Sequence, residues 1–156
     1  MNVKELLKIK GTALFTVKPS APLSEAVIMM DQHDIGAIVV MEAGELVGLV
    51  TFREVIAILA RRLTEHYAGP TLPIAELFVH EAMKVNPTTT HPEMDVDELR
   101  NLMLTTQSRY VPVMDGKTLL CIISPRDISR AVLAEKHFEN KLLKAYIKDW
   151  PEKAEE

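Results

Sequence analysis

Apolar positions along the chain form short continuous runs that alternate with stretches of helical spacing. Residues 14–17 are a short apolar run ended by Pro19, which predicts a strand. An amphipathic helix is predicted next, because apolar residues recur at positions i, i+3, i+4 and i+7: Leu23, Ala26, Val27 and Met30. Two further runs, residues 38–41 and 46–50, flank a turn at Ala43 and Gly44 and predict a pair of buried strands.

The same pattern returns 73 residues later without a gap. In the second half, residues 110–114 and 119–123 predict strands on either side of a turn at Asp115 and Gly116. Eight residues of the first half are repeated at this offset: Thr16, Pro19, Glu25, Met30, Val40, Met41, Leu46 and Arg53 match Thr89, Pro92, Glu98, Met103, Val113, Met114, Leu119 and Arg126. The chain therefore contains two copies of one strand–helix–strand–strand–helix unit, and the predicted fold class is α/β (α+β).

A final helix is predicted in each copy, after Thr51 and after Ser124. Pro and Gly at residues 69–73 interrupt the helical pattern and mark a connection between the copies. The expected boundaries are residues 10–67 for the first copy, 68–77 for the linker, 78–136 for the second copy, and 137–156 for a C-terminal helix (residues 138–148) with a charged tail. Each copy is small for an independent core, so we expect the two sheets to pack together around a pseudo-twofold axis and form two related clefts.

Composition narrows the class of protein. The chain has 156 residues, of which 47% are hydrophobic and 26% charged, and its net charge is −4, whereas a nucleic-acid binder usually has a basic excess. Cys121 is the only cysteine and lies in an apolar run, so we expect a buried thiol in a reducing compartment. Neither a membrane span nor a signal peptide is visible, and a cytoplasmic location is expected.

The two final helices begin with related four-residue motifs. Ser124 precedes Pro125, the residue favoured at the first helical position, so Ser124 is expected to cap the helix and Asp127 to occupy its third position. Free amides at such a helix start, together with the Arg126 guanidinium, suit phosphate, and an ionised carboxylate can accept hydrogen bonds from two ribose hydroxyls. Residues 51–54 (Thr-Phe-Arg-Glu) form the equivalent motif of the first copy. Both motifs also fit a capping box that needs no ligand.

The duplicated sequence resembles the cystathionine-β-synthase (CBS) domain family. The resemblance rests on Ile-Gly-Ala-Ile-Val-Val at residues 35–40 with Leu-Val-Gly-Leu-Val-Thr-Phe-Arg-Glu at 46–54, and on Ser-Arg-Tyr-Val-Pro-Val at 108–113 with Leu-Cys-Ile-Ile-Ser-Pro-Arg-Asp at 120–127. It covers residues 10–136 and implies a CBS-domain pair that senses AMP, ADP, ATP, NAD or S-adenosylmethionine as a regulatory ligand. It also implies a homodimer shaped as a disk, which signals to an effector protein that the sequence does not name.

The resemblance also implies a set of ligand contacts. Asp127 would accept hydrogen bonds from ribose, with Ser124 and Arg126 near phosphate. Small Gly36 and Ala37 would let a purine lie close to the backbone. Glu54 is one methylene longer than the family's Asp and can bond its own helix cap, so we expect unequal clefts with Asp127 in the tighter one. The full set of expected contacts is Asp127, Ser124, Arg126, Ile123, Arg109, Tyr110, Val111, Pro112, Thr88, Thr51, Arg53, Glu54, Ile35, Gly36, Ala37 and Thr12.

Other functions are less well supported by the sequence. The histidines are scattered without metal-ligand spacing, so no metal site is expected. No nucleophile–base arrangement is visible, and we expect neither an enzyme nor a required cofactor. The alternative is a ligand-independent interaction or dimerisation module, in which both motifs serve only as helix caps.

Overall fold

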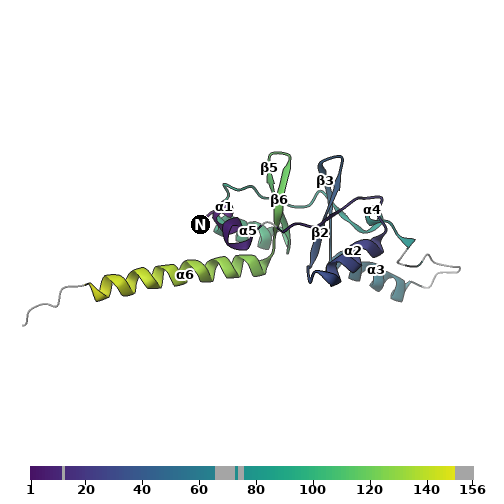
Figure 1. The fold of residues 1–156 in the computed structure, drawn as a ribbon. Helices are drawn as coiled ribbons and strands as arrows, with labels where there is room; N and C mark the ends of the chain where they lie inside the picture. The colour runs from purple at the N-terminus through teal and green to yellow at the C-terminus, as the bar shows by residue number, and fades with distance from the viewer. Residues whose placement is uncertain (12, 66–72, 74–75, 150–156) are drawn as a thin grey trace, which may run out of the picture.

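The computed structural model describes residues 1–11, 13–65, 73 and 76–149. Thr12, one of the expected base contacts, lies outside the described residues, as do most of the expected linker and the charged tail from residue 150 onward. Figure 1 shows two β-hairpins side by side, each flanked by helices, and one long helix that extends away from the body.

Both repeats form the elements that the hydrophobic pattern predicts, except for the first strand of the second repeat. The first repeat contains β1 (Thr16–Val17), α2 (Leu23–Gln32), β2 (Ala37–Glu42), β3 (Glu45–Thr51) and α3 (Phe52–Thr64). The second contains α5 (Val96–Thr106), β5 (Val111–Asp115), β6 (Thr118–Ile123) and α6 (Pro125–Lys148). Its expected first strand is reduced to one parallel bridge between Thr90 and Val113. That bridge lies 73 residues after the Val17–Val40 pair, so the duplication persists in the pairing.

The strands form one larger and one smaller sheet. In the first repeat the order is β1-β2-β3-β4, where β4 (Lys84–Val85) is an added edge strand, β1 is parallel to β2, and the other pairs are antiparallel. In the second repeat β5 and β6 form an antiparallel hairpin. Both hairpins have a register shift at the equivalent step, Val40/Met41 and Val113/Met114. Such a bulge increases local twist, and its repetition shows that the two copies keep the same backbone detail.

Each repeat receives a short helix from the chain segment that precedes the other repeat. Helix α1 (Val3–Lys10), which the sequence analysis did not predict, packs on α6, and its Val3 and Leu6 are buried with the core of the second repeat. Helix α4 (Val79–Ala82) places Val79 in the core of the first repeat. Full burial of one such aliphatic side chain contributes about 1.5–3 kcal/mol. The repeats are therefore joined by exchanged helices, and the boundaries at residues 10–67 and 78–136 remain a proposal.

The two sheets pack against each other as expected. A small apolar cluster lies between the hairpins, with Ala37, Val39 and Leu49 of the first repeat against Tyr110, Leu119 and Ile122 of the second. Each repeat also has its own aliphatic core on the helical side of its sheet. The two hairpins are therefore in direct apolar contact.

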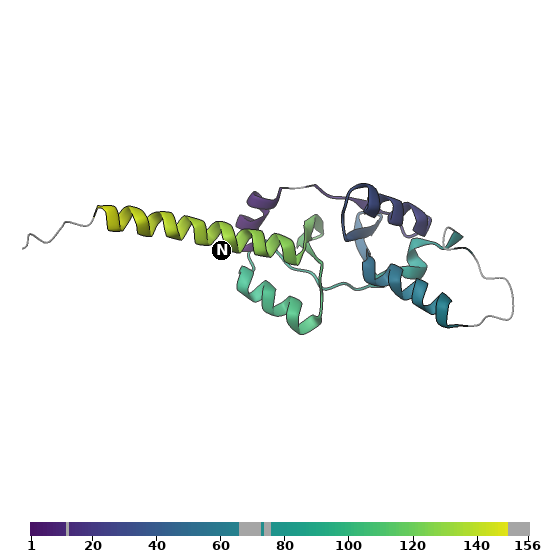
Figure 2. The same ribbon diagram turned by 90° about the horizontal axis from the view of Figure 1, so that it is seen from below.

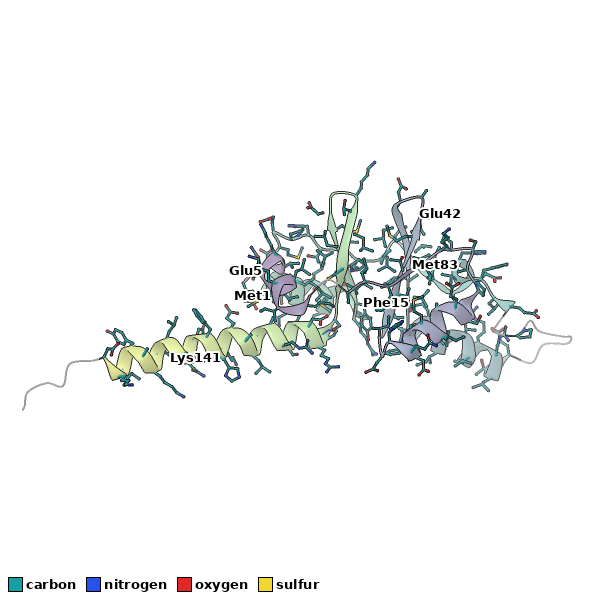
Figure 3. All side chains as sticks on the ribbon, in the orientation of Figure 1. Met1, Glu5, Phe15, Glu42, Met83 and Lys141 are labelled. Carbon is teal, nitrogen blue, oxygen red and sulfur yellow. The ribbon has the colours of Figure 1, made fainter. Side chains whose placement is uncertain are left out.

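Helix α6 differs from the expected pair of separate helices. Residues 125–148 form one uninterrupted helix, whose first turns bury Ile128 and Ala131 in the core. Figure 2 shows this helix continuing well past α1 and α5. In Figure 3, side chains surround the protruding part near Lys141 on every side of the helix. The expected helix at residues 138–148 exists, but as an extension of the helix that begins after Ser124.

Candidate functional site

The start of α6 holds the Asp127 carboxylate in a fixed position. Ser124 adopts an extended backbone conformation and caps the helix, accepting a 3.3 Å hydrogen bond from the Asp127 amide at its hydroxyl oxygen. In return, the Ser124 amide and hydroxyl donate to Asp127 Oδ2 over 2.8 Å and 2.9 Å. The capping box predicted from the sequence is therefore present, and its carboxylate points back toward the helix start.

Lys10, at the end of α1, is a third partner of this carboxylate. Its Nζ lies 2.6 Å from Asp127 Oδ2 and also donates to the Ile122 carbonyl. The exposed fractions of the two side chains are 21% for Lys10 and 11% for Asp127. Burial by itself would raise the pKa of Asp127, but the hydrogen bonds from Lys10 and Ser124 outweigh burial and hold that pKa below its usual value. Asp127 is thus an ionised acceptor at neutral pH.

The second oxygen of the Asp127 carboxylate, Oδ1, can still accept hydrogen bonds. All three donors described above bind Oδ2, and within the described part of the chain no hydrogen bond to Oδ1 is found. A carboxylate offers about four acceptor positions. Asp127 can therefore accept at least one more donor from a ligand without a change in the protein.

Asp127 lies in a cavity of about 440 Å³ between the repeats. The second repeat contributes the start of α6 and Tyr110, and the first repeat contributes the segment before β2. Seven of the residues expected from the sequence line this cavity: Asp127, Ser124, Arg126, Tyr110, Ile35, Gly36 and Ala37. The structure thus brings together residues nearly a hundred positions apart, and the volume is within the range of small-molecule sites.

Tyr110 lies directly against Gly36 in this cavity. A β-carbon built on Gly36 would be 1.9 Å from the Tyr110 hydroxyl oxygen and 2.9 Å from Cε2 of Phe52. Only a residue without a side chain fits here. Gly36 therefore accommodates an aromatic ring of the protein itself.

Charged groups line the cavity at the start of α6. Arg126 and Arg130 line it together with the backbone of this helix start, which carries the positive end of the helix dipole. Pro125 has no amide proton and the Asp127 amide already donates to Ser124, so Arg126 contributes the available amide. The acidic residues among the lining are Asp127, which is paired with Lys10, and Asp34. This end of the cavity can therefore bind an anionic group.

The second cleft differs from the first in composition. A cavity of about 620 Å³ is lined by Arg53 of the first repeat and by Ser108 and Arg109 of the second, together with residues of α5 and α6. Thr51 and Glu54 do not line it. The Glu54 carboxylate accepts hydrogen bonds from the Thr51 amide, over 2.8 Å, and from the Thr51 hydroxyl. Glu54 therefore binds its own helix cap, as expected, and Asp127 does the same in the second repeat.

The remaining expected contacts lie outside both cavities. Val111 and Ile123 are fully buried in the core of the second repeat, and Pro112 is paired with Ile122 in the β5–β6 ladder. Thr88 is half-buried in the segment before the Thr90 bridge. Cys121 is fully buried, and burial raises the pKa of its thiol, so it is held as a neutral apolar side chain.

Comparison with known proteins identifies the family. The model of the CBS domain family, described as "CBS domain", matches residues 3–61 and 79–134. The chain belongs to the CBS domain family. It is a tandem CBS pair, because both repeats match the same model.

Known CBS proteins and solved CBS structures are similar to this chain. The CBS domain-containing protein YhcV of Bacillus subtilis is 31% identical over 118 residues, which is 76% of this chain and 78% of the relative. The crystal structure of the CBS-domain containing protein ATU1752 from Agrobacterium tumefaciens is similar with a TM-score of 0.73 at 31% identity, covering 84% of this chain and 98% of that chain. A structure of CBSX2 in complex with AMP has a TM-score of 0.63 at 23% identity, over 79% and 90% of the two chains, and shows the same fold.

Several residues of the CBS-pair cavity were not anticipated. Lys10 ends α1, Ala13, Leu14 and Phe15 belong to the segment that leads from α1 to β1, and Asp34, Phe52 and Arg130 also line the cavity. Arg130 is exposed while still lining the site. Lys10 is 117 residues from Asp127 in sequence, so no local pattern indicates their contact.

No described helix combines the length and apolar character needed to cross a bilayer.

Proposed function

We propose that this CBS pair is a regulatory module that binds an adenosine nucleotide in the cavity at Asp127. In the proposed complex the ribose hydroxyls donate to the Asp127 carboxylate and the phosphate lies near Arg126 and the start of α6. AMP, ADP, ATP and NAD all contain the required ribose and phosphate. The ligand acts as a signal, not as a substrate or a required cofactor.

One observation supports this proposal most directly. Both repeats contribute residues to the cavity at Asp127. The carboxylate of Asp127 is ionised and its Oδ1 can accept a further hydrogen bond, while the guanidinium groups of Arg126 and Arg130 also line the cavity. Carboxylates accept from sugar hydroxyls, and guanidinium groups with helix-start amides bind phosphate. The distribution of these groups matches a molecule with adjacent hydroxyls and an anionic end. The AMP-bound CBSX2, which has the same fold, gives independent support for this ligand class.

Unequal occupancy of the two clefts follows from the same contacts. Both carboxylates bind their own helix cap, but Asp127 also lines its cavity, whereas Glu54 does not line the second cleft. We therefore assign the tighter site to Asp127 and a weaker or absent one to Glu54.

Transmission of the signal is proposed to use the contact between the repeats. A ligand in the cavity touches the segment before β2 in one repeat and the start of α6 in the other, and the hairpins share an apolar cluster. Occupancy that favours one packing of the repeats would shift the population toward that packing. An effector protein would respond to this change.

A homodimer is proposed on the basis of the exposed face of α3. This helix buries none of its residues, yet it presents apolar side chains at positions i, i+4, i+7 and i+11: Phe52, Ile56, Leu59 and Leu63, exposed by 50%, 61%, 42% and 82%. Leu104 on α5 is 77% exposed. Exposed apolar stripes of this kind mark interfaces. The second copy of the chain is the proposed partner.

The alternative is a ligand-independent dimerisation module. It is supported by the fact that Asp127 already has three partners within its own chain. In that case the carboxylate serves only to cap α6 and to pair with Lys10.

Thermal unfolding with and without ligand separates the two functions. A ligand at about 100 times its dissociation constant adds roughly 2.7 kcal/mol to the free energy of unfolding. For a chain of this size that corresponds to a rise in Tm of roughly 5–10 °C. We expect such a rise with at least one of AMP, ADP, ATP and NAD, and a much smaller one in Asp127→Asn, which keeps the size of the side chain. No rise with any of these nucleotides, or with S-adenosylmethionine, would support the alternative.

A further inference from the structure

Lys10 binds one oxygen of the carboxylate that we propose as the ribose acceptor. Its ammonium is 2.6 Å from Asp127 Oδ2, and the same oxygen accepts from the Ser124 amide and hydroxyl. Because three donors already bind Oδ2, this oxygen has little capacity for a further hydroxyl. A ribose hydroxyl can bind Oδ1 without displacing a donor, but two adjacent hydroxyls that bind one carboxylate oxygen each also need Oδ2.

Lys10 is held in this place by the fold. Helix α1 is fixed to the second repeat by the buried side chains of Val3 and Leu6, and by backbone hydrogen bonds from Val3 to Met94 and from Lys4 to Pro92. Lys10 is the last residue of this helix. Its side chain also donates to the Ile122 carbonyl, so the ammonium is fixed by two acceptors inside the cavity.

We propose that Lys10 is an intramolecular competitor of the ligand and determines its specificity at the Asp127 site. This inference rests on the proposed nucleotide site. A ribose that binds both oxygens of Asp127 displaces the ammonium from Oδ2. The displaced ammonium then lies in the same cavity as the group bound near Arg126 and Arg130, and a phosphate there gives it a new anionic partner. A neutral nucleoside gives it none.

The consequence is a preference for phosphorylated ligands. Binding of adenosine breaks the Lys10–Asp127 ion pair without replacement, whereas binding of AMP exchanges one anion for another. Breaking a partly buried ion pair by removal of one partner is costly, because the other charge remains desolvated. The ion pair therefore penalises adenosine more than it penalises AMP.

The test measures the affinities of adenosine and AMP for the unsubstituted chain and for two variants. Lys10→Met keeps the length of the side chain and removes its charge. Lys8→Met is the matched control, because Lys8 is an exposed lysine on the same helix and lies outside the cavity. Isothermal titration calorimetry gives the dissociation constants, and circular dichroism establishes that each variant is folded. If Lys10→Met is unfolded, Lys10→Gln takes its place in the same comparison.

We expect Lys10→Met to bind adenosine about tenfold more tightly than the unsubstituted protein, which is about 1.4 kcal/mol. The gain with AMP should be smaller, so that the preference for AMP over adenosine falls. Lys8→Met should leave both affinities unchanged.

Two results would overturn the inference, and they are distinguishable from failure of the proposed function. If the unsubstituted protein binds AMP but Lys10→Met binds adenosine no more tightly, Lys10 is not a competitor. A fall in the preference caused only by weaker AMP binding would show a simple phosphate contact and would also refute competition. If neither protein binds adenosine, AMP, ADP, ATP or NAD, the proposed nucleotide site itself is wrong.

Discussion

Tyr110 of the second repeat lies against Gly36 of the first, so closely that a β-carbon on Gly36 would be 1.9 Å from the Tyr110 hydroxyl oxygen. Gly36→Ala should therefore displace this ring and reduce the free energy of unfolding by about 1–3 kcal/mol. In a Tyr110→Ala background, which lacks the ring, Gly36→Ala should reduce the free energy of unfolding by less, although Phe52 still limits the space. Urea denaturation of the two single variants and the double variant measures this coupling, and additive losses would contradict the contact.

The two helix caps provide a matched pair for separating stability from binding. Ser124→Ala and Thr51→Ala each remove a hydroxyl that accepts a helix amide and donates to the carboxylate at the third position of the helix. Both should lower the free energy of unfolding by about 1 kcal/mol. Only Ser124→Ala should also weaken AMP binding, because only Ser124 lines the Asp127 cavity. Equal losses of AMP affinity in the two variants would refute the assignment of unequal clefts.

The ion pair at Asp127 should make stability depend on pH. The pKa of Asp127 is lowered in the folded protein from its usual value of 3.8, because its hydrogen bonds to Lys10 and Ser124 outweigh the effect of burial. The unfolded chain therefore takes up this proton more readily, so the contribution of Asp127 is fully present above about pH 4–5 and is lost as pH falls through the folded pKa.

Lys10→Met tests this dependence. It should be less stable than the unsubstituted protein at neutral pH, and the difference in the free energy of unfolding should shrink as the pH falls below about 4. Lys8→Met should follow the unsubstituted protein throughout. Urea denaturation across this range measures the difference, and a difference that stays constant with pH would show that Lys10 does not act through the Asp127 carboxylate.

The exposed stripe on α3 predicts a specific disruption of the dimer. Leu59→Glu with Leu63→Glu should weaken self-association at least about a hundredfold, because two apolar side chains per copy lose their buried partners. Ile9→Glu is the control, since Ile9 on α1 is exposed to the same extent as Leu59 but lies on another surface. Native mass spectrometry and light scattering report the subunit number. An unchanged dimer in the α3 variant would place the interface elsewhere.

Local sequence patterns were sufficient for most of the fold. The apolar runs at β2, β3, β5 and β6 and the cap at Ser124 depend on neighbouring residues, so their spacing along the chain predicts them directly. The duplication then fixed the order of elements, because both copies must form the same unit. The first strand of the second repeat was overestimated, since Thr90 makes only a single bridge to Val113.

The contacts that the sequence did not reveal are all long-range. Helix α1 packs on the second repeat, although the chain leads from it into the first. The same exchange brings Lys10 to Asp127 across 117 residues. The spacing of side chains along the sequence does not indicate that a helix before one repeat packs on the other repeat. For the same reason, the sequence did not reveal that the ring of Tyr110 lies against Gly36.

Titration calorimetry with AMP on Asp127→Ala and Glu54→Ala compares the two motifs directly. We predict that Asp127→Ala weakens AMP binding at least about tenfold, or about 1.4 kcal/mol, because it removes the acceptor of the ribose hydroxyls. Glu54→Ala should change the affinity by less than about threefold, which is roughly 0.7 kcal/mol. A larger loss in Glu54→Ala than in Asp127→Ala, or equal affinities in all three proteins, would contradict a nucleotide site built around Asp127.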